Sequence, residues 1–154
     1  MRSTHGPRGV AGVVVRLLVG VGTPVAAQAN VAPPRIELKE NYPNPFFPTT
    51  TIPFLISQEV CARGHQPVVS LKIYNVLVQV VAIPVLTNGS GPRPGAERLD
   101  SLRLRCGEYH AFWDGKYLDG RGEATSGVYY YQLTVDGERF TRKMIAQKKV
   151  TSQQ

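Results

Sequence analysis

The chain has 154 residues, of which 42% are hydrophobic, a length that holds one ordinary domain with a buried core and excludes two. Its formal net charge is +7, but Arg2, Arg8 and Arg16 lie in an N-terminal segment that we expect to be removed, and without them the charge is +4. The other basic residues are spread along the chain except near its end. No helix-turn-helix or aromatic-plus-basic pattern occurs, which argues against a nucleic-acid-binding protein.

The first 29 residues have the pattern of a secretory signal peptide. Residues 1–16 carry three arginines and no acid, residues 17–26 are mostly apolar, and Ala27-Gln28-Ala29 has the form of a cleavage site. The alternative, a membrane-spanning helix, needs about 20 unbroken apolar residues, and Arg16 interrupts the apolar run that begins at Val13. A start codon at one of residues 13–15 would preserve the signal. We expect a mature chain from Asn30 that is secreted to the periplasm, the outer-membrane surface or the exterior.

A short Pro-containing linker, residues 30–37, is expected to lead to a domain at residues 38–149, with a tail at residues 150–154. Near the start of the domain, prolines fix φ at about −65° and push each preceding residue toward extended geometry, and asparagine side chains bond their own backbone in turns. These residue types are concentrated in one run: Asn41, Tyr42, Pro43, Asn44, Pro45 and Phe46. We expect a rigid corner there, followed by a strand in which Ile52, Phe54 and Ile56 alternate with other residues.

The rest of the domain has the period-two patterning of strands and no convincing helix. Val69, Leu71 and Ile73 alternate with polar residues, as do the apolar residues from Tyr129 to Val135. An apolar run from Val76 to Leu86 stops at a Gly- and Pro-rich loop, residues 87–95. Further strands are expected at Ser101–Arg105, Glu108–Trp113 and Arg139–Ile145, the last of these after an Asp136-Gly137 hairpin turn. The spacing predicts an all-β, antiparallel sandwich of about seven strands.

Five motifs follow one another along the domain. They are Asn41–Phe46, Leu71–Leu77 with Tyr74, the segment from Gly107 to Trp113-Asp114-Gly115, Ser126–Tyr131 with Gly127 and Tyr129, and Thr141–Met144. In this order they resemble the C-terminal sorting domain of the type IX (Por) secretion system, which is related to the immunoglobulin-like (Ig-like) domain of the flagellar hook-capping protein. The resemblance implies an Ig-like β-sandwich in a secreted bacterial protein that the outer-membrane export machinery recognises.

Two positions depart from the family pattern. Phe47 stands where the family usually repeats asparagine, and Val78 stands where a glycine usually follows the strand, so we expect the turn after Leu77 to be lost or reshaped. Members of this family also normally follow a large cargo, whereas here the signal peptide runs almost directly into the domain. Either the sequence is part of a longer gene, or the module acts alone. A targeting module and a structural or assembly module, acting as scaffold or adhesive, are therefore the two expected functions.

The cysteines fit an oxidising compartment. Cys61 and Cys106 are the only two, and an even pair in a secreted protein favours one disulfide, with two separate buried thiols as the alternative. Two cysteines alone cannot form a structural zinc site.

No motif predicts catalysis, a cofactor or a small-molecule substrate. Residues 113–120 contain two acids among glycines but lack the ligand spacing of a calcium loop, so we expect a turn in which Asp side chains bond backbone amides. Trp113 is expected to anchor the core. His65 and His110 have no nucleophile in a recognisable elbow. Of the tyrosines at 129, 130 and 131, strand alternation leaves at most one exposed.

The last strand is the expected site of interaction. Four residues of this strand and its continuation are singled out: Arg142, Lys143, Met144 and Lys148. Charged and apolar residues alternate along Thr141–Lys149, which predicts one face in the core and a basic edge. The lysines either protect an edge strand from pairing with other chains or, as the resemblance implies, mark the hairpin that the type IX machinery contacts, by strand addition. The sequence gives no indication of an oligomeric state.

Overall fold

The computed structural model describes residues 34–88, 91 and 95–148, which belong to one compact unit, Pro33–Gln154. The expected signal peptide and C-terminal tail, residues 30–33 of the expected linker, and Lys149 lie outside the described residues. Within them, no helix is long and apolar enough to cross a membrane.

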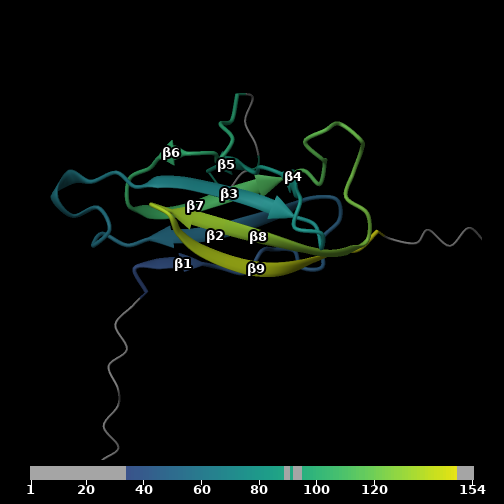
Figure 1. The fold of residues 1–154 in the computed structure, drawn as a ribbon, viewed down its shortest axis with the longest axis horizontal. Helices are drawn as coiled ribbons and strands as arrows, with labels where there is room; N and C mark the ends of the chain where they lie inside the picture. The colour runs from purple at the N-terminus through teal and green to yellow at the C-terminus, as the bar shows by residue number, and fades with distance from the viewer. Residues whose placement is uncertain (1–33, 89–90, 92–94, 149–154) are drawn as a thin grey trace, which may run out of the picture. The chain divides into compact units, whose positions relative to one another are not determined.

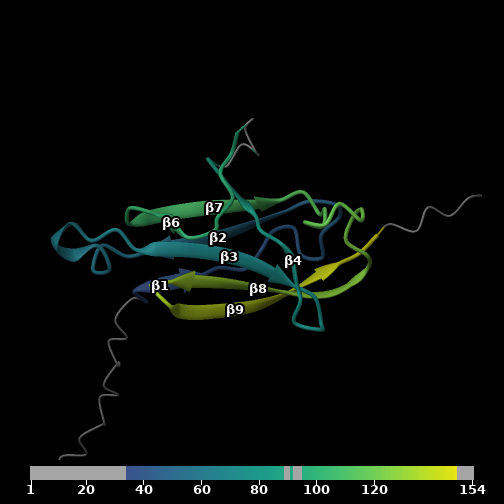
Figure 2. The ribbon, with the colours of Figure 1, turned by 45° about the horizontal axis from the view of Figure 1, so that its top comes forward.

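The described residues form two antiparallel sheets packed face to face (Figures 1 and 2), as the sequence predicts. The four-stranded sheet has the order β1-β2-β7-β5, with bounds Ile36–Leu38, Thr50–Ile56, Gly107–Trp113 and Val85–Thr87. The five-stranded sheet has the order β4-β3-β8-β9, with bounds Val80–Ala82, Val68–Tyr74, Gly127–Val135 and Glu138–Ala146, and β6, Leu102–Arg103, pairs with β3.

This part of the chain contains nine strands rather than about seven, and the extra ones are short. Strand β1 takes in Ile36 and Glu37, which the sequence placed in the linker. The apolar run from Val76 to Leu86 is a turn followed by β4 and β5, which belong to different sheets. Pro84 separates these two strands, and because proline has no N–H to donate, the ladder stops there. A 3-10 turn at Ala62–Gly64 was not expected.

The core lies between the sheets and follows the predicted alternation. Ile52, Phe54 and Ile56 of β2 are buried, as are Val69, Leu71 and Ile73 of β3. On β8 the buried residues are Tyr129, Tyr131, Leu133 and Val135, while Tyr130 is exposed, as the sequence analysis expected. Leu99 closes one side of the core from a loop, where its carbonyl accepts the N–H of Leu71 at 2.8 Å.

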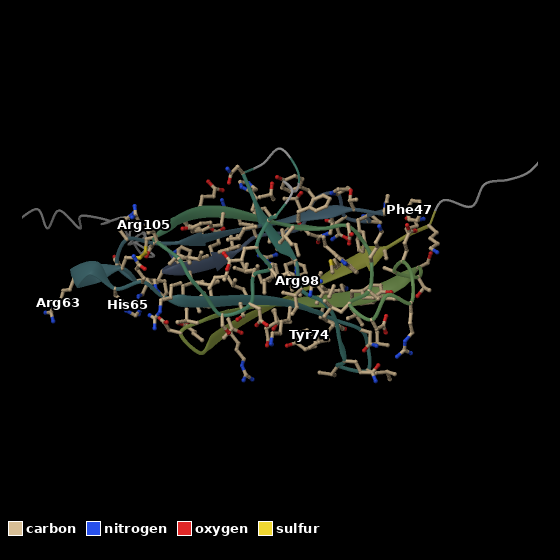
Figure 3. All side chains as sticks on the ribbon, turned by 90° about the horizontal axis from the view of Figure 1, so that it is seen from above. Phe47, Arg63, His65, Tyr74, Arg98 and Arg105 are labelled. Carbon is tan, nitrogen blue, oxygen red and sulfur yellow. A yellow bond between two sulfur atoms is a disulfide. The ribbon has the colours of Figure 1, made fainter. Side chains whose placement is uncertain are left out.

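A disulfide joins Cys61 to Cys106, with the two Cα atoms 5.9 Å apart. It links the 3-10 turn to the start of β7 and encloses a loop whose ends are 45 residues apart in sequence. Figure 3 shows the disulfide at the end of the domain that carries Arg63, His65 and Arg105, opposite the end that carries Phe47. The same end holds a hydrogen bond between the side chains of His65 and Asp136 at 2.7 Å, which lowers the pKa of the Asp136 carboxyl.

The turn between β3 and β4 is retained although the expected glycine is absent. Val78 adopts the left-handed conformation, with φ of 61°, and its N–H donates to the carbonyl of Asn75 at 3.0 Å. The Asn75 side chain accepts the N–H groups of Leu77 and Gln79, both at 3.0 Å. The expectation that the turn is lost is therefore wrong. Asn75 holds the turn through its hydrogen bonds, with Val78 in the left-handed conformation.

Replacing Val78 by glycine is expected to stabilise the domain. The left-handed conformation costs a residue with a β-carbon roughly 1–2 kcal/mol, and glycine avoids this cost. The greater conformational freedom of glycine in the unfolded chain offsets about half of that gain in stability. We expect Val78→Gly to raise the free energy of unfolding by about 1 kcal/mol, measured by urea denaturation. Val80→Gly, in strand β4, is the matched control and should destabilise the domain, since its φ is not left-handed. A Val78→Gly variant less stable than the wild type would contradict the argument.

Candidate functional site

The opening segment, Asn41–Phe46, is bonded to the end of the last strand. The N–H of Phe46 donates to the carbonyl of Ile145 at 2.9 Å, and the N–H of Gln147 donates to the carbonyl of Phe46 at 3.0 Å. The N–H of Ile145 donates to the side-chain oxygen of Asn44 at 3.0 Å. The sequence predicted a corner here but not this contact, because nothing local indicates that two segments about one hundred residues apart will pair.

The side chain of Phe46 is part of a buried aromatic cluster. Its ring lies 5.2 Å from that of Trp113, which in turn lies 5.7 Å from that of Tyr129. All three residues are buried, and the indole N–H of Trp113 donates to the carbonyl of Lys116 at 2.9 Å. Trp113 is therefore the core anchor that the sequence predicted, with its polar atom satisfied.

Asn41 is buried and organises the rest of the opening segment. Its backbone N–H donates to the hydroxyl of Tyr131 at 3.1 Å, and its side-chain amide donates to the carbonyl of Pro43 and to the hydroxyl of Thr50. The Tyr131 hydroxyl donates onward to the carbonyl of Lys39 at 2.9 Å. Burial raises the pKa of Tyr131, so the hydroxyl keeps the proton that it donates.

The exposed part of the opening segment consists of Tyr42, Pro43 and Pro45. Tyr42 is held by two backbone hydrogen bonds to Thr51, both at 2.8 Å. The segment thus runs along the side of the sandwich, with the Phe46 side chain in the core and the Tyr42 side chain in solvent.

Gly115 is required by a close approach to the chain just after the opening segment. Its φ is 79°, and a β-carbon at this position would collide with the carbonyl of Pro48. The flanking acids form the predicted turns, since Asp114 accepts the N–H of Lys116 at 3.0 Å and Asp119 accepts that of Arg121 at 2.9 Å. Among the described residues, no group of three or more His, Cys, Asp or Glu side chains could hold a metal ion.

Two further motif residues lie on the five-stranded sheet. Tyr74 ends β3 directly opposite Tyr130 of β8, and Gly127 begins β8 opposite Ala146 of β9. The side chain of Tyr74 is half-buried and forms no hydrogen bond with a described residue. It is part of the outer face of the five-stranded sheet.

Strand β9 forms the edge of its sheet, and its residues alternate as predicted. Met144 is fully buried, whereas Lys143 and Lys148 are exposed. Arg142 is exposed as well, and its Nε donates to the carbonyl of Leu38 at 2.6 Å, which bonds β9 to β1 of the other sheet. Lys148 follows the strand and is held by a hydrogen bond from its N–H to the hydroxyl of Ser126 at 3.0 Å.

The edge of β9 is closed at one end and open in the middle. In an antiparallel ladder, the backbone groups of alternate residues point away from the partner strand. Ile145 points its N–H and carbonyl outward to the opening segment, so Thr141 and Lys143 point theirs outward as well. Within the described chain, no backbone group bonds to the outward N–H or carbonyl of these two residues. This division of the edge is the feature of the candidate site that sequence analysis missed.

Phe46 and Phe47 provide a matched test of the aromatic cluster. Phe46 is 2% exposed and Phe47 is 43% exposed. We expect Phe46→Ala to lower the free energy of unfolding by about 3–5 kcal/mol, because it leaves a cavity beside Trp113, and Phe47→Ala to have a much smaller effect. Urea denaturation of both variants measures the difference, and equal losses would show that the Phe46 ring is not the anchor.

The geometry combines three features at one side of the domain: a buried aromatic cluster, a fixed end of β9, and outward backbone groups at Thr141 and Lys143. An open strand edge of this kind can accept a strand from another chain. A comparison with protein-family models, curated proteins and solved structures found no match to this chain.

Proposed function

We propose that this chain is a non-catalytic, secreted Ig-like module whose last strand is recognised by outer-membrane export machinery, in the manner of a type IX sorting domain. The observation that carries the proposal is the open backbone edge of β9 at Thr141 and Lys143. The opening segment fixes the end of the strand and leaves this stretch available. A partner that adds a strand here would gain backbone hydrogen bonds without unfolding the domain.

The charges on β9 fit a partner other than a second copy. Arg139 and Lys143 share the outer face of the strand, and Lys148 follows it. Two such edges would bring like charges together, which disfavours pairing between identical chains. An acidic or polar strand would not meet this repulsion. The basic edge thus serves one of the two roles considered from the sequence, protection from self-pairing, while the outward backbone groups of β9 carry the recognition.

A structural or assembly module is the second candidate, and one observation favours it. Asn41, Phe46, Trp113 and Gly115 all have roles inside the domain as core residues, hydrogen-bond partners or close-approach positions. A motif that builds the fold would be present in any relative of the same architecture, whether it is exported as a sorting domain or assembled as a scaffold. The two candidates therefore have to be separated by an export experiment.

The experiment places a folded fluorescent reporter between Ala29 and Asn30, in a host with type IX secretion, and measures surface delivery by protease shaving. Deleting the chain from Arg142 would also remove the buried Met144 and Ala146, so a point variant is sharper. Lys143→Pro removes the outward N–H and spares the bonds to β8. Lys143→Gln is the control that removes the charge and keeps the N–H.

We expect the wild type and Lys143→Gln to reach the surface and Lys143→Pro to remain in the periplasm as a folded protein. Circular dichroism and thermal unfolding of the purified variants establish that each is folded. A folded Lys143→Pro delivered as well as the wild type would refute recognition by strand addition. Retention of the folded wild-type fusion in the periplasm would instead favour the structural or assembly module.

A further inference from the structure

The turn between β3 and β4 presents three consecutive aliphatic side chains to solvent. Val76, Leu77 and Val78 are 65%, 72% and 78% exposed, the highest values among the large hydrophobic residues recorded as exposed. Figure 2 shows this turn projecting beyond the ends of β3 and β4. Single exposed apolar residues are ordinary on protein surfaces. A contiguous group of them at a projecting tip indicates a site of contact with a protein or a membrane.

The conformation of Val78 strengthens this inference. The residue occupies the left-handed region, where glycine is relaxed and a β-branched residue is strained, and its side chain is mostly in solvent. It therefore contributes little packing to offset the strain. A strained residue that adds nothing to folding is a reason to look for a function at that position.

Three of the backbone donors at the tip keep hydrogen-bond partners in a low-dielectric environment. The N–H groups of Leu77, Val78 and Gln79 all donate to Asn75, and the N–H of Asn75 donates to the carbonyl of Gln79 at 3.1 Å. The Asn75 side chain also donates to that of Gln79 at 2.9 Å. An unpaired amide costs free energy when it leaves water, and this turn pairs the amides of Leu77, Val78 and Gln79 within itself.

The apolar surface continues from the tip onto the outer face of the five-stranded sheet. Val80, Tyr74 and Tyr130 are register partners across β4, β3 and β8. The exposed Val128 and Ile145 form the next pair along β8 and β9. Figure 3 shows Tyr74 on this side of the molecule. We call the tip and these neighbours, residues 74, 76–78, 80, 128, 130 and 145, the apolar patch.

Basic side chains border the apolar patch. Lys143 is the register partner of Tyr130, and Lys148 is bonded to Ser126, two residues before Val128. Neither lysine forms an ion pair with a described residue. Arg121, whose carboxylate partner is Asp119, lines a cavity of about 450 Å³ beside Asn75 and Val80. The unpaired positive charges of Lys143 and Lys148 beside the patch fit a partner surface in which anionic groups cover an apolar layer.

We propose that the apolar patch docks on a lipid bilayer with anionic headgroups, with Val76, Leu77 and Val78 inserted at the boundary of headgroups and acyl chains and Lys143 and Lys148 at the phosphates. A projecting tip with aliphatic side chains on successive residues suits a lipid bilayer, because the mobile acyl chains can surround all three side chains. Tyrosines at the level of the headgroups and lysines bordering an apolar surface are typical of interfacial binding. Docking on a membrane does not rest on the proposed export function, although Lys143 borders both the apolar patch and the open edge of β9.

The test is co-sedimentation of the full chain with vesicles of phosphatidylglycerol and phosphatidylcholine in equal parts, and with vesicles of phosphatidylcholine alone. We expect stronger binding to the anionic vesicles and weaker binding at high salt. Leu77→Ser should lower the partition coefficient about tenfold, and Lys143→Gln with Lys148→Gln should lower it about fivefold per lysine on the anionic vesicles only. Tyr42→Ser, which removes an exposed apolar side chain outside the patch, is the matched control and should bind as the wild type does.

Val78→Gly separates membrane docking from loss of folding. This variant is expected to be more stable than the wild type and yet to bind the anionic vesicles more weakly, a combination that unfolding cannot produce. All variants share residues 1–33, so differences between them report the patch and not the N-terminal segment. Equal binding of the wild type and Leu77→Ser, failure of the wild type to bind anionic vesicles, or equal wild-type binding to both vesicle types would overturn the proposal.

Discussion

The packing of Phe46 against Trp113 is the interaction on which the rest of this domain depends. The ring of Phe46 fills the core beside Trp113 and Tyr129, while the backbone of the same residue bonds to Ile145 and Gln147. One residue near the start of the domain therefore fixes both the aromatic core and the end of the last strand. The prolines around it restrict the backbone of the opening segment, and Gly115 leaves room for the carbonyl of Pro48. Within the part of the chain that the structure describes, the outward backbone groups of Thr141 and Lys143 stay free because the opening segment bonds to β9 only at Ile145 and Gln147.

The elements that sequence analysis predicted well are those set by local patterning. The alternation of Val69, Leu71 and Ile73 matches the buried face of β3, because the side-chain period of a strand is two. The Asp136-Gly137 turn joins β8 to β9, with both residues at positive φ, since this dipeptide suits the hairpin turn. The burial of Trp113 and the backbone-bonding role of Asp114 likewise follow from residue type and neighbours.

The features that were missed depend on contacts between distant segments or on a choice between two local conformations. Pairing of Phe46 with Ala146 and the bond from Arg142 to Leu38 join segments about one hundred residues apart, and no local pattern specifies them. The apolar run after Val76 gave no sign that it would divide between two sheets. Val78 retains a turn that its own conformational preference disfavours, because Asn75 supplies the hydrogen bonds. Of the candidate site, the basic character of β9 was predictable and the division of its edge was not.

The central claim is that the edge of β9 is closed at Ile145 and Gln147 and open at Thr141 and Lys143. Native-state hydrogen exchange, read residue by residue by NMR, tests it most directly, because an amide exchanges slowly only when it is bonded or buried. The account predicts slow exchange for the amides of Ile145 and Gln147 and fast exchange for those of Thr141 and Lys143. Equal protection of all four amides, or fast exchange at Ile145, would contradict it.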